Sequence, residues 1–268
     1  MIKNVNLLYL FKFFFLVFMV SCTEISNAQR KDIVISEYLS SNSDMMKVKM
    51  GAQWSGRIMN FKFGDYAVLR KSRMSPKRTE QKSNFLGTKN QYETRYKFDF
   101  LLSYKDIDTA LVEALYIRNV KELYALYIIP IELVLDEIVK DSINFTADIS
   151  LRSNSNNNWK LFFNIKSGIE VEFRNEGILI KDDRTIWIKH VSSNRDGNDK
   201  RRYPALGYEF LENGNAICAV QYFGGGALGY NKNRIWIDSN LNEEMKLILA
   251  ASMAAIMQLK LSEMSEYE

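Results

Sequence analysis

The sequence has very few of the residues on which metalloproteins and small disulfide-rich proteins depend. It contains two cysteines, Cys22 and Cys218, one histidine, His190, and three prolines in 268 residues. A single histidine excludes a metal site built from several histidines, and it makes His190 the only candidate for a catalytic histidine. If Cys22 is removed or acylated, no intramolecular disulfide is possible. We therefore expect packing alone to stabilise the fold.

The chain also lacks a strong excess of charge of either sign. Its 36 basic and 32 acidic residues give a formal net charge of +4, which falls to +2 if residues 1–21, with Lys3 and Lys12, are removed. Nucleic-acid-binding domains usually concentrate basic charge on one face, so this balance argues against a nucleic-acid partner. No segment rich in proline, glycine and serine divides the chain, and we predict one β-rich domain over residues 51–268.

The longest apolar run lies at the N-terminus. Leu7 to Val20 follows a short basic start, is interrupted by Lys12, and is shorter than the roughly 20 residues that a membrane span needs. These features are typical of a cleaved export signal, which we assign to residues 1–21. We therefore expect an exported protein of the periplasm or outer membrane.

Two cleavage sites compete in this signal. Met19-Val20-Ser21-Cys22 resembles a bacterial lipobox, which implies that Cys22 receives a lipid and becomes the mature N-terminus. Two or three acyl chains would hold the protein on a membrane, with residues 22–50 as a tether. The alternative is cleavage after Ala28, which would release a soluble protein that begins at Gln29.

Alternating apolar residues predict a mainly antiparallel β domain. The clearest alternation places Tyr96, Phe98, Phe100, Leu102 and Tyr104 on one face of a strand. The turn sequence Asn213-Gly214 predicts a hairpin between residues 207–211 and 216–223. We predict a turn at residues 174–177 and a short helix at residues 131–139, and leave residues 108–119 open between strand and helix. Further strands are expected at residues 56–63, 66–69, 143–151, 159–165, 184–191 and 234–238.

The C-terminal segment, residues 241–262, is predicted to be a helix. Asn240, with Glu243 three residues later, is a plausible N-terminal cap. Leu247 to Met257 is apolar on nearly every side but too short to cross a bilayer, so the helix should be surrounded by protein. The predicted fold class is therefore α+β, mainly antiparallel β: a barrel-like or strongly curved sheet packed around a hydrophobic C-terminal helix.

This order of elements resembles the tubby-like C-terminal domain, which is shared with scramblase-type proteins. The resemblance lies in Tyr208-Glu209-Phe210, Asn213-Gly214, Ala219-Val220-Gln221, Trp236-Ile237 and the helix from Leu247 to Met257. It implies a β-barrel that encloses the helix. Tubby-like domains bind phosphoinositides through basic residues, but no matching site can be placed in this sequence, so that activity is not carried over.

A basic run provides one candidate site. Arg70, Lys71, Arg73, Lys77 and Arg78 fall in a segment without apolar periodicity, and we predict a long hairpin loop there. The loop is either simply solvated or, with Lys82 and Lys200-Arg201-Arg202, an anion-binding patch for lipid headgroups or acidic glycans.

A glycine run provides a second candidate. Gly224, Gly225 and Gly226 begin a formal G-x-G-x-x-G pattern, but the segment after it is predicted to be a strand. A dinucleotide site needs a helix there, so we expect no cofactor. The run is either a hairpin loop or, beside Tyr222 and Tyr230, part of a ligand cleft.

The remaining reactive residues favour structural roles. Cys218 lies in an apolar strand without a basic neighbour, and His190 lies in a strand, so we expect an inert thiol and a packed or surface histidine. The carboxylates of Asp182-Asp183 and Asp136-Glu137 point apart, so no catalytic or metal site is predicted. The sequence therefore favours a lipid-anchored, non-enzymatic binding module with a protein or glycan partner. The alternatives are a secreted hydrolase that uses acidic residues and a protein that binds anionic lipid or glycan.

Overall fold

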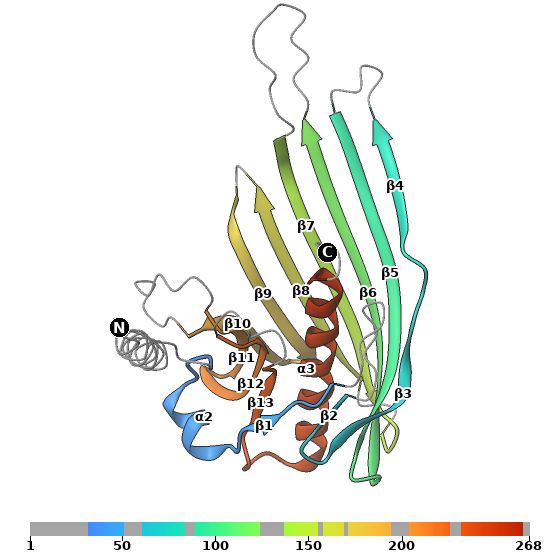
Figure 1. Cartoon of the computed structure of the whole chain (residues 1–268). Coiled ribbons are helices and arrows are strands. Elements are labelled where there is room, and N and C mark those ends of the chain that lie inside the picture. The colour runs from blue at the N-terminus through green and yellow to red at the C-terminus, as the bar shows by residue number, and fades with distance from the viewer. Residues whose placement is uncertain are drawn as a thin grey trace, which may run out of the picture.

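The computed structural model describes residues 32–50, 61–83, 89–123, 137–154, 158–168, 171–193, 204–225 and 232–264. In these segments one antiparallel sheet of 13 strands curves around a C-terminal helix (Figure 1). The strand order is β1-β13-β12-β11-β10-β9-β8-β7-β6-β5-β3-β2, and β4 pairs with β5.

The two helices are α2 (Glu37–Asn42) and α3 (Glu243–Met264). The strands are β1 (Met46–Lys47), β2 (Lys62–Phe63), β3 (Tyr66–Met74), β4 (Arg78–Ser83), β5 (Lys89–Tyr104), β6 (Asp108–Leu123), β7 (Glu137–Leu151), β8 (Asn158–Gly168), β9 (Val171–Lys181), β10 (Arg184–Ser192), β11 (Leu206–Glu212), β12 (Asn215–Phe223) and β13 (Arg234–Ile237).

The two ends of the sheet meet and nearly close a barrel. The backbone of Lys49, just after β1, and that of Lys62 in β2 exchange two hydrogen bonds of 2.7 and 2.9 Å. Closure of this kind satisfies edge groups that would otherwise remain unpaired. The predicted fold class, an antiparallel barrel-like sheet around a hydrophobic C-terminal helix, is confirmed.

Helix α3 fills the interior of the barrel. It packs against β5, β6, β7, β12 and β13, and its residues from Leu247 to Ser262 are all buried. By length and composition α3 is the one helix in the described segments that could cross a membrane, yet 94% of its apolar window is buried inside the protein. The small side chains of Ala250, Ala251 and Ala254 let the strands approach closely. The prediction that protein surrounds this helix is confirmed.

The longest strands extend beyond α3. A helix of 22 residues is about 33 Å long, whereas a strand of 16 residues, such as β5 or β6, reaches about 50 Å. The difference is visible in Figure 1, where β5, β6 and β7 rise past the C-terminal end of α3. The sheet therefore has a filled part around the helix and a part that projects beyond it.

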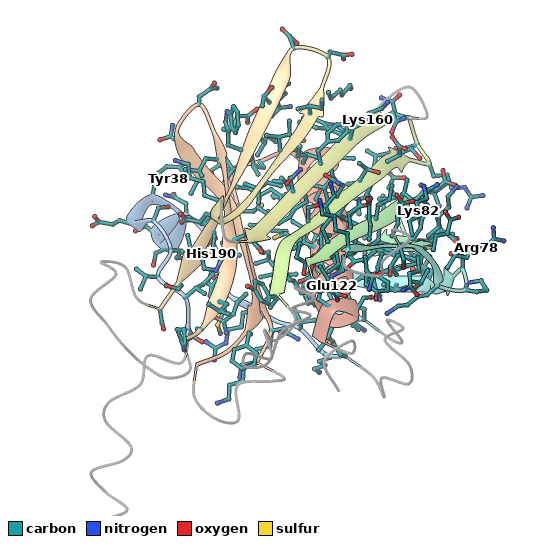
Figure 2. All side chains as sticks on the ribbon, turned by 90° about the horizontal axis from the view of Figure 1, so that it is seen from above. Tyr38, Arg78, Lys82, Glu122, Lys160 and His190 are labelled. Carbon is teal, nitrogen blue, oxygen red and sulfur yellow. The ribbon has the colours of Figure 1, made fainter. Side chains whose placement is uncertain are left out.

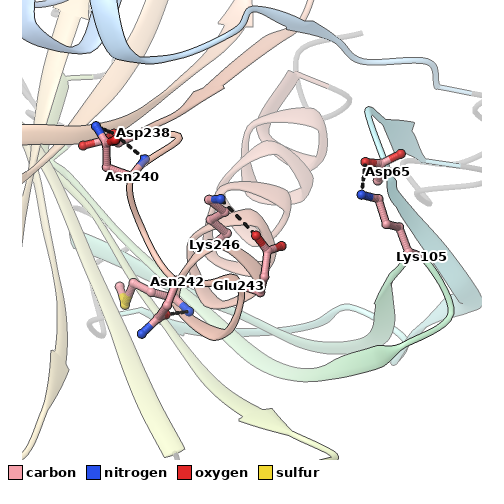
Figure 3. Close-up of polar contacts among 8 residues, drawn as sticks. Asp65, Lys105, Asp238, Asn240, Asn242, Glu243 and Lys246 are labelled. Atoms are coloured by element: carbon pink, nitrogen blue, oxygen red, sulfur yellow. Dashed lines mark hydrogen bonds and ion pairs between the residues drawn. The ribbon is translucent and has the colours of Figure 1, made fainter.

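The cap of α3 differs from the prediction by two residues. The side-chain oxygen of Asn242 accepts a 2.8 Å hydrogen bond from the Met245 backbone N–H (Figure 3). The predicted cap, Asn240, instead donates its side-chain amide to Asp238 at 3.0 Å. Asn240 is wrong as the cap because Asp238 holds its side chain in the preceding turn.

The predicted tether is shorter than residues 22–50, because residues 32–50 belong to the barrel. Strand β1 pairs with β13, and α2 lies against β12 and β13. Leu39 of α2 is fully buried beside Ile33 and Trp236 on the outer side of the sheet. The apolar residues of residues 32–50 are too scattered to show a helical or strand periodicity. The sequence therefore predicts a polar tether for this segment.

Three local predictions are wrong for the described residues. Arg70, Lys71 and Arg73 lie in β3 and Arg78 in β4, so most of the basic run is strand rather than loop. The expected turn at residues 174–177 is continuous strand in β9, paired with β8. Ile138 and Val139, expected in a helix, lie in β7. In each case the hydrogen bonds to a long neighbouring strand override a local signal.

Other local predictions are confirmed. Residues 108–119, left open, are strand, and the strand at Tyr96 to Tyr104 is the second half of β5. The β11–β12 hairpin turns at Asn213 and Gly214, with φ values of 51° and 83°. Both residues adopt the left-handed conformation that this two-residue turn requires.

Candidate binding sites

A polar pocket lies where α3 enters the barrel. Its volume is about 330 Å³, and one wall is formed by the first turns of α3, including Asn242 and Glu244. The opposite wall comes from the turn between β9 and β10, with Lys181, Asp182 and Asp183. The other lining residues are Asn154, Trp159, Arg184, Met245 and Ile248.

Charges of both signs line this pocket. Arg184 donates two hydrogen bonds to the carboxylate of Glu212 at 2.5 and 3.0 Å, and its guanidinium lies 5.4 Å from the centre of the Trp159 ring. The hydrogen bonds to Glu212 raise the pKa of Arg184, so this cation is fixed in place. Within the described segments no group of three histidine, cysteine or acidic residues is placed to hold a metal ion. The pocket suits a small polar molecule.

A buried lysine marks the other end of α3. The Lys260 ammonium lies 2.9 Å from a carboxylate oxygen of Glu263, and 5.8 and 5.5 Å from the ring centres of Tyr208 and Tyr222. The two rings stack with centres 5.4 Å apart. One carboxylate and two ring faces thus compensate a cation whose burial would otherwise be costly. The arrangement holds the C-terminal end of the helix against β11 and β12.

His190 belongs to this end of the barrel. On β10 it follows the buried Ile186 and Ile188 on the same face, and its ring meets that of Tyr208 edge to face with centres 5.7 Å apart. Partial burial, and then the charge of Lys260, lowers the pKa of His190. The lowered pKa favours the neutral imidazole, which packs against an aromatic ring on one side and contacts solvent on the other.

Cys218 is fully buried in β12, between Phe210 of β11 and Ile237 of β13. Burial, and then the charge of Glu209, raises the pKa of the thiol well above its usual value. A protonated thiol without access to solvent is a poor nucleophile, which agrees with the predicted structural role.

The basic run does not form a uniform patch in the parts that the structure describes. Lys77 lies over the ring of Tyr96 at 5.5 Å, whereas Arg78 is exposed at the start of β4. Arg78 and Lys82 share a face of β4 with Glu80 between them, so an acidic residue divides the basic charge. Figure 2 shows Arg78 and Lys82 on the opposite side of the barrel from His190.

The other predicted sites lie largely outside the described residues. Cys22, Gly226 and Lys200-Arg201-Arg202 are outside them, as are the side chains of Arg70, Lys71 and Arg73. Of the glycine run, Gly224 and Gly225 are described, and both are buried directly after β12.

Sequence reasoning missed a row of apolar side chains on the outer face of the sheet. Cross-strand pairing places five residues side by side on β6 to β10, which we call the outer row: Leu115, Thr146, Phe162, Ile178 and Trp187. The Trp187 side chain is 58% exposed and that of Phe162 38%. The other three members are half-buried. Large exposed apolar groups that gather on one face are typical of binding surfaces.

The comparisons with known proteins add no relative. No protein-family model, curated protein or solved structure matches the chain. The polar pocket and the outer row are therefore the features that bear on function.

Proposed function

We propose that this chain is an exported cell-envelope lipoprotein, anchored through a lipid on Cys22, whose barrel is a non-enzymatic binding module. The observation that carries the binding role is the contrast between a barrel filled by α3 and an outer face that exposes Trp187 and Phe162. Within the described residues α3 occupies the barrel interior that a lipid would need, which favours recognition at the outer face.

The anchor rests on the sequence alone. Cys22 directly follows the apolar run, and the described fold begins at Asp32, so only a short connection separates the barrel from the membrane. A module held close to a periplasmic or outer membrane surface would meet envelope proteins and glycans before other molecules. Nucleic acid is not a proposed partner.

We also propose a distant relation to the tubby-like and scramblase-type barrels. The support is the shared arrangement of an antiparallel barrel around a hydrophobic C-terminal helix. Fold similarity of this kind carries no activity with it. The basic residues Lys77, Arg78 and Lys82 are the described members of the candidate anionic-lipid site, and Glu80 between Arg78 and Lys82 weakens the attraction.

A second candidate function is hydrolysis in the polar pocket, because Asp182, Asp183 and Glu244 all line it. Two carboxylates that flank a bound glycosidic bond are the usual machinery of such enzymes. Hydrolysis of a polysaccharide that disappears in the double variant D182N/D183N would support this alternative over the binding module.

The proposal is tested by intact mass spectrometry of the mature protein from native membranes, compared with the variant Cys22→Ala. We expect an acylated chain that starts at Cys22, and loss of the variant from the membrane fraction. A free chain that starts at Gln29 would remove the lipoprotein and favour a secreted protein.

A further inference from the structure

The two most exposed aromatic side chains of the outer row are placed at a defined separation. Phe162 of β8 pairs with Ile178 of β9, and Ile178 pairs with Trp187 of β10. One strand, β9, therefore lies between the two aromatic residues. Two strand spacings correspond to about 10 Å. The rings therefore form two apolar platforms on one sheet face, with Ile178 between them.

Hydrogen-bonding groups border the row on both sides. Residues two positions along each strand share its face, which places Asn144 and Asn164 on one border and Asp148 and Lys160 on the other. The Asn164 amide donates a 2.9 Å hydrogen bond to the side-chain oxygen of Asn144. Both N–H groups of Asn144, and the second N–H and the oxygen of Asn164, take no part in this hydrogen bond. All four side chains are exposed.

The charges beside the row nearly cancel. Glu113 and Asp148 are acidic, Lys160 and Lys189 are basic, and all four are exposed. Glu176 also falls beside the row by its position on β9, opposite Lys189. An acidic or basic macromolecule gains little overall from such a surface. An uncharged ligand rich in hydroxyl groups can accept from the lysines and donate to the carboxylates.

The apolar surface is narrow at its middle. Polar residues stand on both sides of Thr146 and Phe162, whereas Ile117 borders Leu115 and Ile180 borders Ile178 on one side each. The row therefore has no broad apolar centre surrounded by a rim. A stable protein–protein interface buries about 800 Å² on each partner around such a centre. A single row fits a chain-like ligand better than a folded protein.

We propose that the outer row binds an extended, uncharged polysaccharide, with sugar rings stacked on Trp187 and Phe162 and sugar hydroxyls hydrogen-bonded to Asn144, Asn164, Asp148 and Lys160. This inference rests on the proposed binding function and names its ligand class. An aromatic ring buries the apolar C–H face of a sugar, and the flanking amides and charges replace water at its edge.

The test is retention of the purified mature protein on three insoluble, uncharged β-1,4-linked polysaccharides: chitin, cellulose and mannan. We expect retention on at least one, and about ten-fold weaker binding for Trp187→Ala. Phe162→Ala should weaken binding less, because its ring is less exposed. The matched control is Ile107→Ala, since Ile107 is 77% exposed in the turn between β5 and β6, away from the row.

Each outcome decides the question. Failure of the unmodified protein to bind all three materials would overturn the proposal, and so would equal binding by Trp187→Ala with an unchanged thermal melt. If Trp187→Ala instead converts a sedimenting oligomer to a monomer, the face is a protein contact and the proposal is wrong. An acylated protein that binds no polysaccharide contradicts this inference alone, whereas a polysaccharide-binding protein without acyl groups contradicts only the anchor.

Discussion

Two rows of side chains lie back to back on strands β6 to β10. The inner row consists of Tyr116, Phe145, Phe163, Gly177 and Ile188, all buried beneath the sheet. Each member is the sequence neighbour of a member of the outer row, whose Trp187 and Phe162 face solvent. The two rows thus share the same strands and the same pairing, and they differ only in which side of the sheet they occupy.

The comparison separates residues that stabilise the fold from residues left available for binding. An inner-row phenylalanine is surrounded by protein, so its removal leaves a cavity. An outer-row phenylalanine is already half in water, so its removal changes little in the free energy of unfolding. The following substitutions test this difference.

The largest effect should come from a charge placed on the inner face. Ala147 is 2% exposed between Ala114 and Leu161, so Ala147→Asp would bury an unpaired carboxylate. We expect a loss of at least about 4 kcal/mol and a melting temperature lower by roughly 8 °C or more. The neighbouring Thr146→Asp, on the outer face, should melt within a few degrees of the unmodified protein. Similar melting temperatures for the two variants would contradict the assignment of faces.

A smaller loss is expected at Gly177, where an inner-row side chain is absent. A Cβ there would collide with the ring of Phe163 and approach the Phe162 carbonyl oxygen to 2.9 Å. Gly177→Ala should destabilise the protein by about 1–3 kcal/mol in urea unfolding, because the packed ring must move. Ile178→Ala is the matched control, because it measures the loss in free energy of unfolding when the neighbouring residue on the outer face is changed. A stabilised Gly177→Ala would show that the ring relaxes without strain.

The cap of α3 is expected to contribute about 1 kcal/mol, as an average N-cap does. Asn242→Ala removes the acceptor for the Met245 N–H, and the expected decrease in unfolding free energy is that of an average cap. Asn242→Ser keeps an acceptor and should restore most of the loss. An unchanged stability of Asn242→Ala would mean that water satisfies this end of the helix equally well.

His190 should give the smallest effect, visible only in the pH dependence. Because its pKa is lower in the folded protein, the unfolded chain binds a proton first as the pH falls below about 6.5. The stability contributed by neutral His190 is complete above that pH and decreases below it. His190→Asn should flatten the slope of melting temperature against pH between 6.5 and 5, and an unchanged slope would assign it to other groups.

Part of the inner face could be predicted from the sequence, but the outer row could not. Tyr116 lies in a segment that could be strand or helix by its pattern, and Gly177 in a segment that resembles a turn. Alternation in β5 and β7 marks Phe98, Phe100 and Phe145 as one buried face without any tertiary information.

Trp187, by contrast, lies between Thr185 and Lys189 on the outward face of β10, and the sequence of one strand does not show what a single exposed tryptophan does. Its meaning depends on the register of five strands, and a shift of one residue would send it to the other face.

The same reason limits the prediction of the polar pocket. The turn at Asp182 and Asp183 can be predicted from its residues, and so can the start of α3. The sequence does not show that these two segments line one pocket, because more than 50 residues separate them along the chain. The closure of the barrel sets the distance between them. For the basic run, one of the two candidate sites that the sequence suggests, the pattern predicts a loop because charged residues paired in strands leave no apolar period.

The most direct test of the account compares two neighbouring residues of β8. Phe162 and Phe163 are chemically identical, and they differ only in the face that they occupy. In urea unfolding, Phe163→Ala should lower the free energy of unfolding by about 3–5 kcal/mol and Phe162→Ala by less than about 1 kcal/mol. Equal losses for the two variants would contradict the central claim that the inner row stabilises the barrel and the outer row is left for binding.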